Sequence, residues 1–185
     1  MQYFTPAETA KLLRVAHKAT SPQGQRQHLA MMVMAFTGTR ISQMLALKGE
    51  DIILKDGKWV ILLGAAKRGN AVVRTLRVDA DPAFDMTPLI ALAQTRRQSR
   101  LFDSLSRQYF NKMMAKYCNE AGLHSSYAHS HVFRHSAAMA IFDATQRIGA
   151  VSEFLGHRSP ASAFVYLKEN DGMLAQDAMD NLVLA

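Results

Sequence analysis

The stretch of this sequence that most restricts the fold is His131-Val132-Phe133-Arg134-His135, which is followed by Leu155-Gly156-His157 and then by Tyr166. On a helix, His131 and Arg134 lie three residues apart and therefore on one face, where both side chains can donate hydrogen bonds to one anion. Each piece alone has an ordinary explanation: a solvated helix face, a helix C-cap at Gly-His, and a core tyrosine. Their joint order and spacing favour a shared site instead.

Helical patterns lie on both sides of this stretch. Thr5, Pro6 and Glu8 form the pattern of a capping box with proline at the first helical position, so a helix is predicted to begin there. Ser130 is predicted to cap the helix that carries the histidines, and Gly122 to end the helix before it. Apolar periodicity predicts helices over residues 6–19, 29–38, 40–48, 86–99, 106–121, 130–145, 148–155 and 160–167, with a break at 21–24.

Between residues 52 and 78 the periodicity changes from helical to alternating. Two apolar runs, 52–54 and 59–63, flank a turn at 55–58 and read as a hairpin. A second turn at 67–70 leads into residues 72–78, where Val72 and Arg74 share one face. We therefore expect a mainly α fold with a small three-stranded antiparallel β-sheet. The chain shows no linker, internal repeat or low-complexity tract, so residues 1–185 are expected to form a single catalytic domain with a tail at about 172–185.

The charge of the chain attracts polyanions. Lys and Arg number 22 against 15 Asp and Glu, which gives a formal net charge of +7, and nucleic acid is the commonest large polyanion in a cytoplasm. Many proteins are modestly basic without binding DNA, so charge alone leaves DNA binding a minority hypothesis. The longest apolar run, 29–36, is too short to cross a membrane, no secretory signal opens the chain, and Cys118 is the single cysteine. These features predict a cytoplasmic protein.

The motifs together resemble the tyrosine recombinase (phage integrase) family. The segment 37–47, which contains Arg40, looks like the first box of that family, and 131–135 looks like its His-x-Leu-Arg-His box. Leu155-Gly156-His157 looks like its Leu-Gly-His motif, and Tyr166 follows nine residues on, where the family has its nucleophile. The turn that contains Lys67 is similar to the hairpin turn of the family's lysine. The resemblance runs from about residue 4 to beyond Tyr166.

This sequence departs from the family pattern in three places. Gln43 stands where glutamate is frequent, and Phe133 replaces the usual leucine. Neither position contacts the phosphate in the family, so the resemblance implies no loss of activity from them. Family members usually carry a separate DNA-clamping domain before the catalytic one, whereas here the first catalytic-domain helix begins at once. The chain is therefore expected to be a short form without the clamp or an excised domain.

The resemblance implies a site-specific DNA recombinase or integrase that cleaves and rejoins strands by transesterification. Tyr166 attacks phosphorus, forms a 3′-phosphotyrosyl bond and releases a 5′-hydroxyl; a free tyrosine, with a pKa of about 10, needs activation for this. Arginines suit the phosphate because they stay protonated and donate paired hydrogen bonds. The implied catalytic residues are Arg40 and Arg134 on the phosphate, His157 as a further donor, His131 for proton exchange with Tyr166, and Lys67 to protonate the departing oxygen. No metal, ATP or other cofactor is implied.

Three other functions fit parts of the sequence. His129, His131 and His135 cluster, and the last two have the spacing of a zinc helix, as in a metal hydrolase. The residue after His131 is Val132, however, where His-Glu-x-x-His enzymes carry their catalytic glutamate. A DNA-binding regulator of the same fold without catalysis is disfavoured because all six candidate positions hold suitable residues. A type IB topoisomerase, which shares the chemistry and relaxes DNA, stays open.

The expected partner is double-stranded DNA. Basic residues that could follow the phosphate backbone, or form a solvated charged face, are Arg68, Arg96, Arg97, Arg100, Arg107 and Lys112. The resemblance further implies a homo-oligomer, a tetramer, on DNA and a monomer without it, associated with the nucleoid and with no membrane. The tail places Leu174, Ala178 and Leu182 in one row, which either packs on its own domain or docks on a neighbouring protomer, as such tails commonly do in the family.

Overall fold

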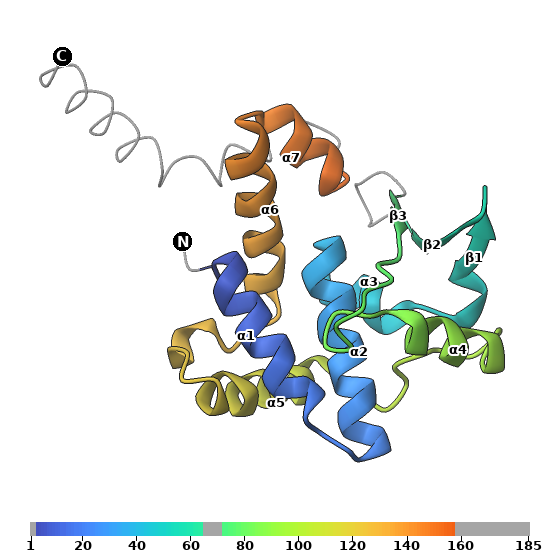
Figure 1. Cartoon of the computed structure of the whole chain (residues 1–185), viewed down its shortest axis with the longest axis horizontal. Helices are drawn as coiled ribbons and strands as arrows, with labels where there is room; N and C mark the ends of the chain where they lie inside the picture. The colour runs from blue at the N-terminus through green and yellow to red at the C-terminus, as the bar shows by residue number, and fades with distance from the viewer. Residues whose placement is uncertain (1–2, 65–71, 158–185) are drawn as a thin grey trace, which may run out of the picture.

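The computed structural model describes residues 3–64 and 72–157, which form a helical body with a small sheet at one side (Figure 1). The elements are α1 (Pro6–His17), α2 (Pro22–Thr37), α3 (Ile41–Ala46), the 3-10 helix η1 (Gly49–Asp51), β1 (Ile52–Lys55), β2 (Lys58–Leu63), β3 (Val72–Thr75), α4 (Thr87–Thr95), α5 (Arg107–Glu120), the 3-10 helix η2 (Ser125–Tyr127), α6 (His131–Thr145) and α7 (Ile148–Phe154). The predicted fold class is confirmed. The predicted helix at 160–167 and the tail at 172–185 lie outside the described residues.

The helical body is built on α2. This helix packs against α1, α3 and α6, and α1 also contacts α5 and α6. Residues 29–34 of α2 are all buried, so α2 is the apolar centre around which the other helices pack. Within the described ranges, no helix has both the length and the apolar character needed to cross a membrane.

The helix N-termini show how the local sequence sets the element boundaries. At α1 the predicted capping box is present: the Thr5 hydroxyl accepts from the Glu8 backbone N–H at 3.2 Å, and the Glu8 carboxylate accepts from the Thr5 N–H at 2.8 Å. The predicted break at 21–24 is the start of α2, because Ser21 caps it and accepts from the Gly24 N–H at 3.1 Å. The prediction that Ser130 caps α6 is wrong: its backbone is already helical, with φ −61° and ψ −30°, whereas a capping residue is extended. Its N–H donates to Asn111 Oδ1 at 3.1 Å.

The three strands run antiparallel in the order β1-β2-β3, with Ile61 of β2 facing Ile52 on one side and Arg74 on the other. The face that carries Ile61 and Leu63 is buried against the helices. The strand predicted over 72–78 ends at Thr75, although the Leu76 N–H still donates to the Trp59 carbonyl at 2.8 Å. Val78, at the end of the predicted strand, is 70% exposed.

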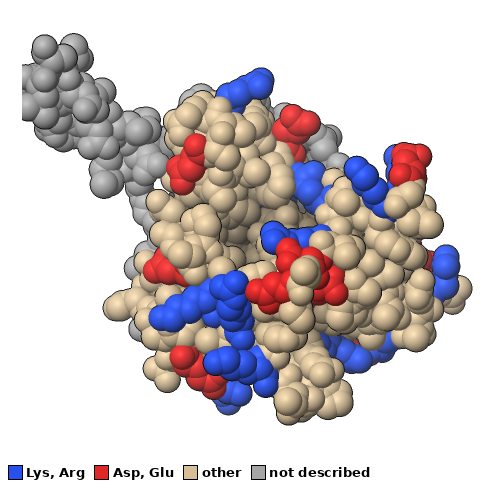
Figure 2. Space-filling view, viewed as in Figure 1, with Lys and Arg blue, Asp and Glu red and all other residues tan. Residues whose placement is uncertain are grey.

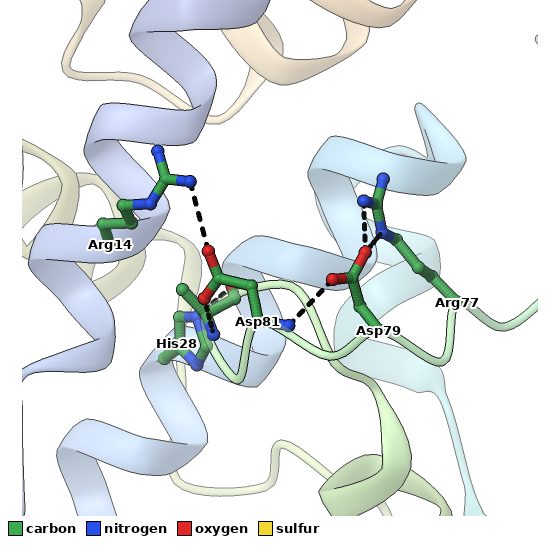
Figure 3. Close-up of polar contacts among 6 residues, drawn as sticks. Arg14, His28, Arg77, Asp79 and Asp81 are labelled. Atoms are coloured by element: carbon green, nitrogen blue, oxygen red, sulfur yellow. Dashed lines mark hydrogen bonds and ion pairs between the residues drawn. The ribbon is translucent and has the colours of Figure 1, made fainter.

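Polar contacts with the helices replace sheet pairing beyond β3 (Figure 3). The Arg77 guanidinium pairs with the Asp79 carboxylate, which accepts from the Asp81 N–H at 2.9 Å. Asp81 in turn pairs with Arg14 of α1 at 3.1 Å. The buried His28 of α2 contacts a carbonyl of the same loop, and its burial lowers its pKa to about 4. The loop is thus attached to α1 and α2, which explains why the apolar alternation overestimates the strand.

The fourth helix is also shorter than predicted. It ends at Thr95, and the carbonyls that follow accept hydrogen bonds from η1: Glu50 N–H donates to Arg97 O at 2.6 Å. Gly49 lies so close that an added Cβ would be 2.3 Å from the Ala93 carbonyl oxygen, so only glycine fits there. This tertiary pairing with η1 ends the helix before residue 99.

Candidate active site

Arg134 lies at the centre of the candidate site. It projects from α6, is only 5% exposed, and donates from Nη1 to the Gly38 carbonyl at 2.7 Å and from Nη2 to the Leu155 carbonyl at 2.9 Å. Gly38 is the C-cap of α2, with a left-handed φ of 60°, and Leu155 is the C-cap of α7. Helix C-terminal carbonyls carry partial negative charge and need donors. The guanidinium therefore joins the ends of two helices that are far apart in the sequence.

His157 lies directly beside this guanidinium. Its Nε2 is 2.9 Å from Arg134 Nη2. Gly156, with φ 65°, turns the chain out of α7, and the His157 N–H donates back to the Ser152 carbonyl at 2.9 Å. This is the geometry of a glycine C-cap. The Gly-His pair thus ends the helix and also brings the imidazole to Arg134.

Arg40 stands at the N-cap of α3 with a half-buried side chain. Its backbone N–H donates to Gln43 Oε1 at 3.1 Å, and the Thr39 hydroxyl donates to the same oxygen at 3.2 Å. Gln43 Nε2 donates to the Gly64 carbonyl, beyond the end of β2, at 2.6 Å. Gln43 therefore fixes the backbone of Arg40 relative to the sheet.

The charges of Arg40 and Arg134 act on two histidines. Burial, Arg134 and Arg40 together lower the pKa of His157 to about 4. His131 lies in the first turn of α6. Its pKa is lowered by partial desolvation, by His129 and Arg107, and by the same two arginines. These interactions place four predicted residues in one electrostatic neighbourhood. A neutral imidazole also agrees with the contact at Nε2, because a nitrogen that faces a guanidinium N–H accepts and carries no proton.

The predicted residues separate into three groups. Arg40, His131, Arg134 and His157 come together, and Arg107, predicted to bind DNA, lies near His131. Arg96 is held by Asp103, whereas Arg97, Arg100 and Lys112 are exposed. Lys67, Arg68 and Tyr166 lie outside the described residues.

The alternative metal site finds no support in the geometry of the described ranges. In residues 3–64 and 72–157, no three His, Cys, Asp or Glu side chains are arranged to hold an ion. His129, His131 and His135 therefore form no such group there.

Two residues beside the site, Gln43 and Arg74, have contacts that the sequence did not predict. Both make hydrogen bonds to backbone carbonyls of segments that are distant in the sequence, Gly64 and Phe154 respectively. The alternation in the third strand predicted that Arg74 shares a face with the apolar Val72, which is an unusual position for a charged side chain. That pattern was the one feature of the sequence that could have indicated a special role for Arg74.

The sequence and the fold both match one family. The chain belongs to the phage integrase family, whose sequence profile matches residues 2–173. It is 30% identical over 177 residues to the tyrosine recombinase XerC of Roseiflexus castenholzii, covering 90% of this chain and 55% of that protein. It is 23% identical over 171 residues to the tyrosine recombinase XerH of Campylobacter jejuni, covering 89% and 48%.

Solved structures of recombinases have a similar fold. A XerH site-specific recombinase bound to a difH substrate in a pre-cleavage complex superposes with a TM-score of 0.75 at 25% identity, covering 95% of this chain and 52% of that one. The XerA recombinase has the same fold, with a TM-score of 0.73 at 20% identity, covering 98% and 64%. The chain spans about half the length of the curated relatives it matches.

Proposed function

We propose that this chain is the catalytic domain of a site-specific tyrosine recombinase, which cleaves and rejoins double-stranded DNA through Tyr166. The observation that carries the proposal is the environment of Arg134. Its buried guanidinium is held by the ends of α2 and α7, and His157 Nε2 lies 2.9 Å from it. Arg40 is close enough to lower the pKa of the same imidazole. Family membership supports it. The names of the relatives and the DNA-bound XerH complex support the choice of DNA as substrate.

The two arginines supply the charge that the reaction needs. A DNA phosphodiester gains negative charge on its non-bridging oxygens as the nucleophile approaches, and arginines held in place beforehand stabilise that charge without having to reorganise. Arg134 is the more rigidly held of the two, because carbonyls from two helices orient it. Arg40 is oriented through its backbone, by Gln43.

In the proposed step, one bond to phosphorus forms as another breaks, and each proton has a donor and an acceptor. Tyr166 Oη forms a bond to phosphorus as the P–O5′ bond breaks, the tyrosyl proton passes to His131, and Lys67 donates a proton to the departing O5′. Rejoining is the reverse, with the 5′-hydroxyl as nucleophile, so the phosphotyrosyl bond preserves the energy for ligation. Neutral His131, whose pKa is lowered, is in the correct state to accept a proton.

His157 has a different starting state. Its Nε2 accepts from Arg134, so that nitrogen cannot donate to a phosphate until it gains a proton or the contact opens. A phosphate anion placed between Arg40 and Arg134 raises the pKa of His157 from about 4, since it offsets the two positive charges. DNA binding thus favours the protonated, donating form.

The proposed assembly is a homo-oligomer, a tetramer, on DNA at the nucleoid in the cytoplasm. An apolar groove of about 320 Å³ opens between α1, α2 and α6, and it is lined by Phe4, Leu13, Phe36, Phe133 and Ala137 among others. Figure 2 shows the hollowed face on which these helices lie. The row of Leu174, Ala178 and Leu182 in the tail has a matching apolar character, and we assign this groove to the tail of a neighbouring protomer.

Trapping the covalent intermediate tests the proposal. Because the target sequence is unknown, the 185-residue chain would be incubated with a pool of nicked duplexes with a randomised core, so that the cut fragment diffuses away and prevents rejoining. We expect a protein–DNA adduct that survives denaturation, and none with Tyr166→Phe, which should still bind DNA. An adduct formed equally by Tyr166→Phe would disprove the nucleophile, and no adduct from the wild type would overturn the proposal.

A further inference from the structure

Arg74 occupies an unusual position in the sheet. It lies on β3, paired with Ile61, on the face that turns toward the protein interior. Its neighbours on that face, Val72 and Leu76, are apolar, and Leu76 is 4% exposed. A charged side chain placed there loses hydration, which lowers the pKa of the Arg74 guanidinium. Such a residue is stable only when specific contacts replace the lost water.

One such contact comes from its own strand, where Arg74 Nη1 donates to the Val73 carbonyl at 2.9 Å. The others come from the end of α7. The Arg74 guanidinium carbon lies 4.2 Å from the centroid of the Phe154 ring, in a cation–π contact. Nη2 also donates a hydrogen bond to the Phe154 carbonyl. The carboxylate of Glu153, one residue earlier, favours the charged guanidinium. Figure 1 shows the end of α7 next to β3.

The helix that receives these contacts has few other attachments. It has seven residues and packs on α6 through a small cluster of Ala138, Phe142, Val151 and Leu155, separate from the main core. The carbonyls of its last residue and of its C-cap are held by two arginines: Phe154 O by Arg74 and Leu155 O by Arg134. The chain reaches His157 two residues later.

We propose that Arg74 is a positioning residue: by fixing the end of α7 against β3, it holds His157 and Arg134 in their mutual arrangement. A displacement of the Phe154 carbonyl would move the adjacent Leu155 carbonyl, which orients Arg134, and Gly156, which directs His157. In this proposal Arg74 acts through the end of α7 and not by contact with the substrate. Its effect on catalysis rests on the function proposed above, whereas its effect on His157 does not.

The first test follows His157 itself, without DNA. The imidazole would be titrated by NMR in the full chain, with its signal assigned through His157→Gln. In the wild type we expect titration near the pKa of about 4. Arg74→Met, which keeps the apolar length but removes the donor and the charge, should shift the midpoint up toward the ordinary value of about 6.5, because His157 loses burial and its contact with Arg134.

Two variants separate position from charge. Arg74→Lys keeps the positive charge but cannot provide a planar stack together with a hydrogen bond, so it should shift the midpoint in the same direction by a smaller amount. Arg147→Met removes an exposed arginine at the other end of α7 and should leave His157 unchanged. If Arg74→Met leaves the His157 midpoint near that of the wild type, the proposal is wrong.

The second test measures cleavage of the DNA recovered from the trapped adduct. We expect Arg74→Met to form adduct about tenfold more slowly, with non-covalent affinity for the same duplex unchanged, because misplacement of catalytic groups affects the chemical step more than binding. Should Arg74→Met fold poorly, Phe154→Leu removes only the stacking ring and should give a smaller loss in the same direction. A variant that loses thermal stability alone, with normal cleavage and a normal His157, would show that Arg74 serves the fold only. Absence of adduct from the wild type would count against the proposed function, while the titration would still decide the role of Arg74.

Discussion

At the scale of single residues, the site depends on how a buried positive charge is accommodated. Arg134 is almost fully buried, which is costly for an unpaired charge. The Gly38 and Leu155 carbonyls and His157 Nε2 replace its hydration. All three are uncharged acceptors, so none of them neutralises the positive charge of the guanidinium. An aspartate in their place would have held Arg134 equally well but would have cancelled the charge.

The two arginines should therefore respond differently to the same substitution. Arg134→Lys removes the fork that reaches both carbonyls and should lower the free energy of unfolding by about 1–3 kcal/mol. Arg40→Lys should change it by less than about 0.5 kcal/mol, because the Arg40 side chain is half-buried and its helix contacts are made by the backbone.

Both variants should form the covalent adduct roughly 100-fold more slowly, since each removes a bidentate donor from the phosphate. Urea unfolding and adduct kinetics measure the two effects separately. Equal losses of stability in the two variants would contradict the structural difference between the arginines. Unchanged adduct formation in either variant would remove that arginine from the site.

At the scale of elements, Gln43 connects α3 to the sheet. Its oxygen accepts from Arg40 N–H and its nitrogen donates to Gly64 O. A glutamate, frequent at this position in the family, can reproduce the first contact but not the second unless it is protonated, because a carboxylate has no donor. The amide is therefore suited to the position of Gly64 in this chain.

This gives Gln43→Glu a distinctive pH dependence. Above the pKa of the new carboxyl group, two oxygens face each other and the contact with the Gly64 carbonyl is lost. Below that pKa, the protonated carboxyl group can donate to this carbonyl. The adduct rate relative to the wild type should be about tenfold lower at pH 8 and should recover as the pH falls through this pKa. Gln43→Ala, which has no group to protonate, should show a deficit that does not vary with pH. A constant ratio for Gln43→Glu across pH 5 to 8 would contradict the account.

At the scale of the whole molecule, the tail is predicted to drive assembly. Truncation after Asn170 removes the apolar row that we assign to the groove of a neighbouring protomer. The shortened chain should form adduct on isolated duplexes but assemble into tetramers on DNA far less well, as measured by analytical ultracentrifugation. Ala137→Arg, which places a charge in the groove, should reproduce the defect. If the truncated chain forms tetramers on DNA at the same protein concentration as the wild type, the tail has no docking role.

The sequence predicted local features of this fold better than its tertiary ones. The capping box at Thr5 and the glycine C-cap at Gly156 depend on neighbours within a few residues, so the pattern was sufficient. The third strand and fourth helix were predicted too long, because their ends are set by contacts with Arg14 and η1 that no local pattern contains. For the same reason the positions of Gln43 and Arg74 could not be assigned a role: their partners lie 21 and 80 residues away.

The most direct measurement of the central claim is the site of covalent attachment. The trapped adduct would be digested with nuclease and protease, and the peptide that retains a nucleotide would be sequenced by mass spectrometry. We predict that the nucleotide remains on Tyr166, joined through a 3′-phosphate, with the released DNA strand ending in a 5′-hydroxyl. Attachment at Tyr109, Tyr117 or Tyr127, or a released strand with a 5′-phosphate, would contradict the account.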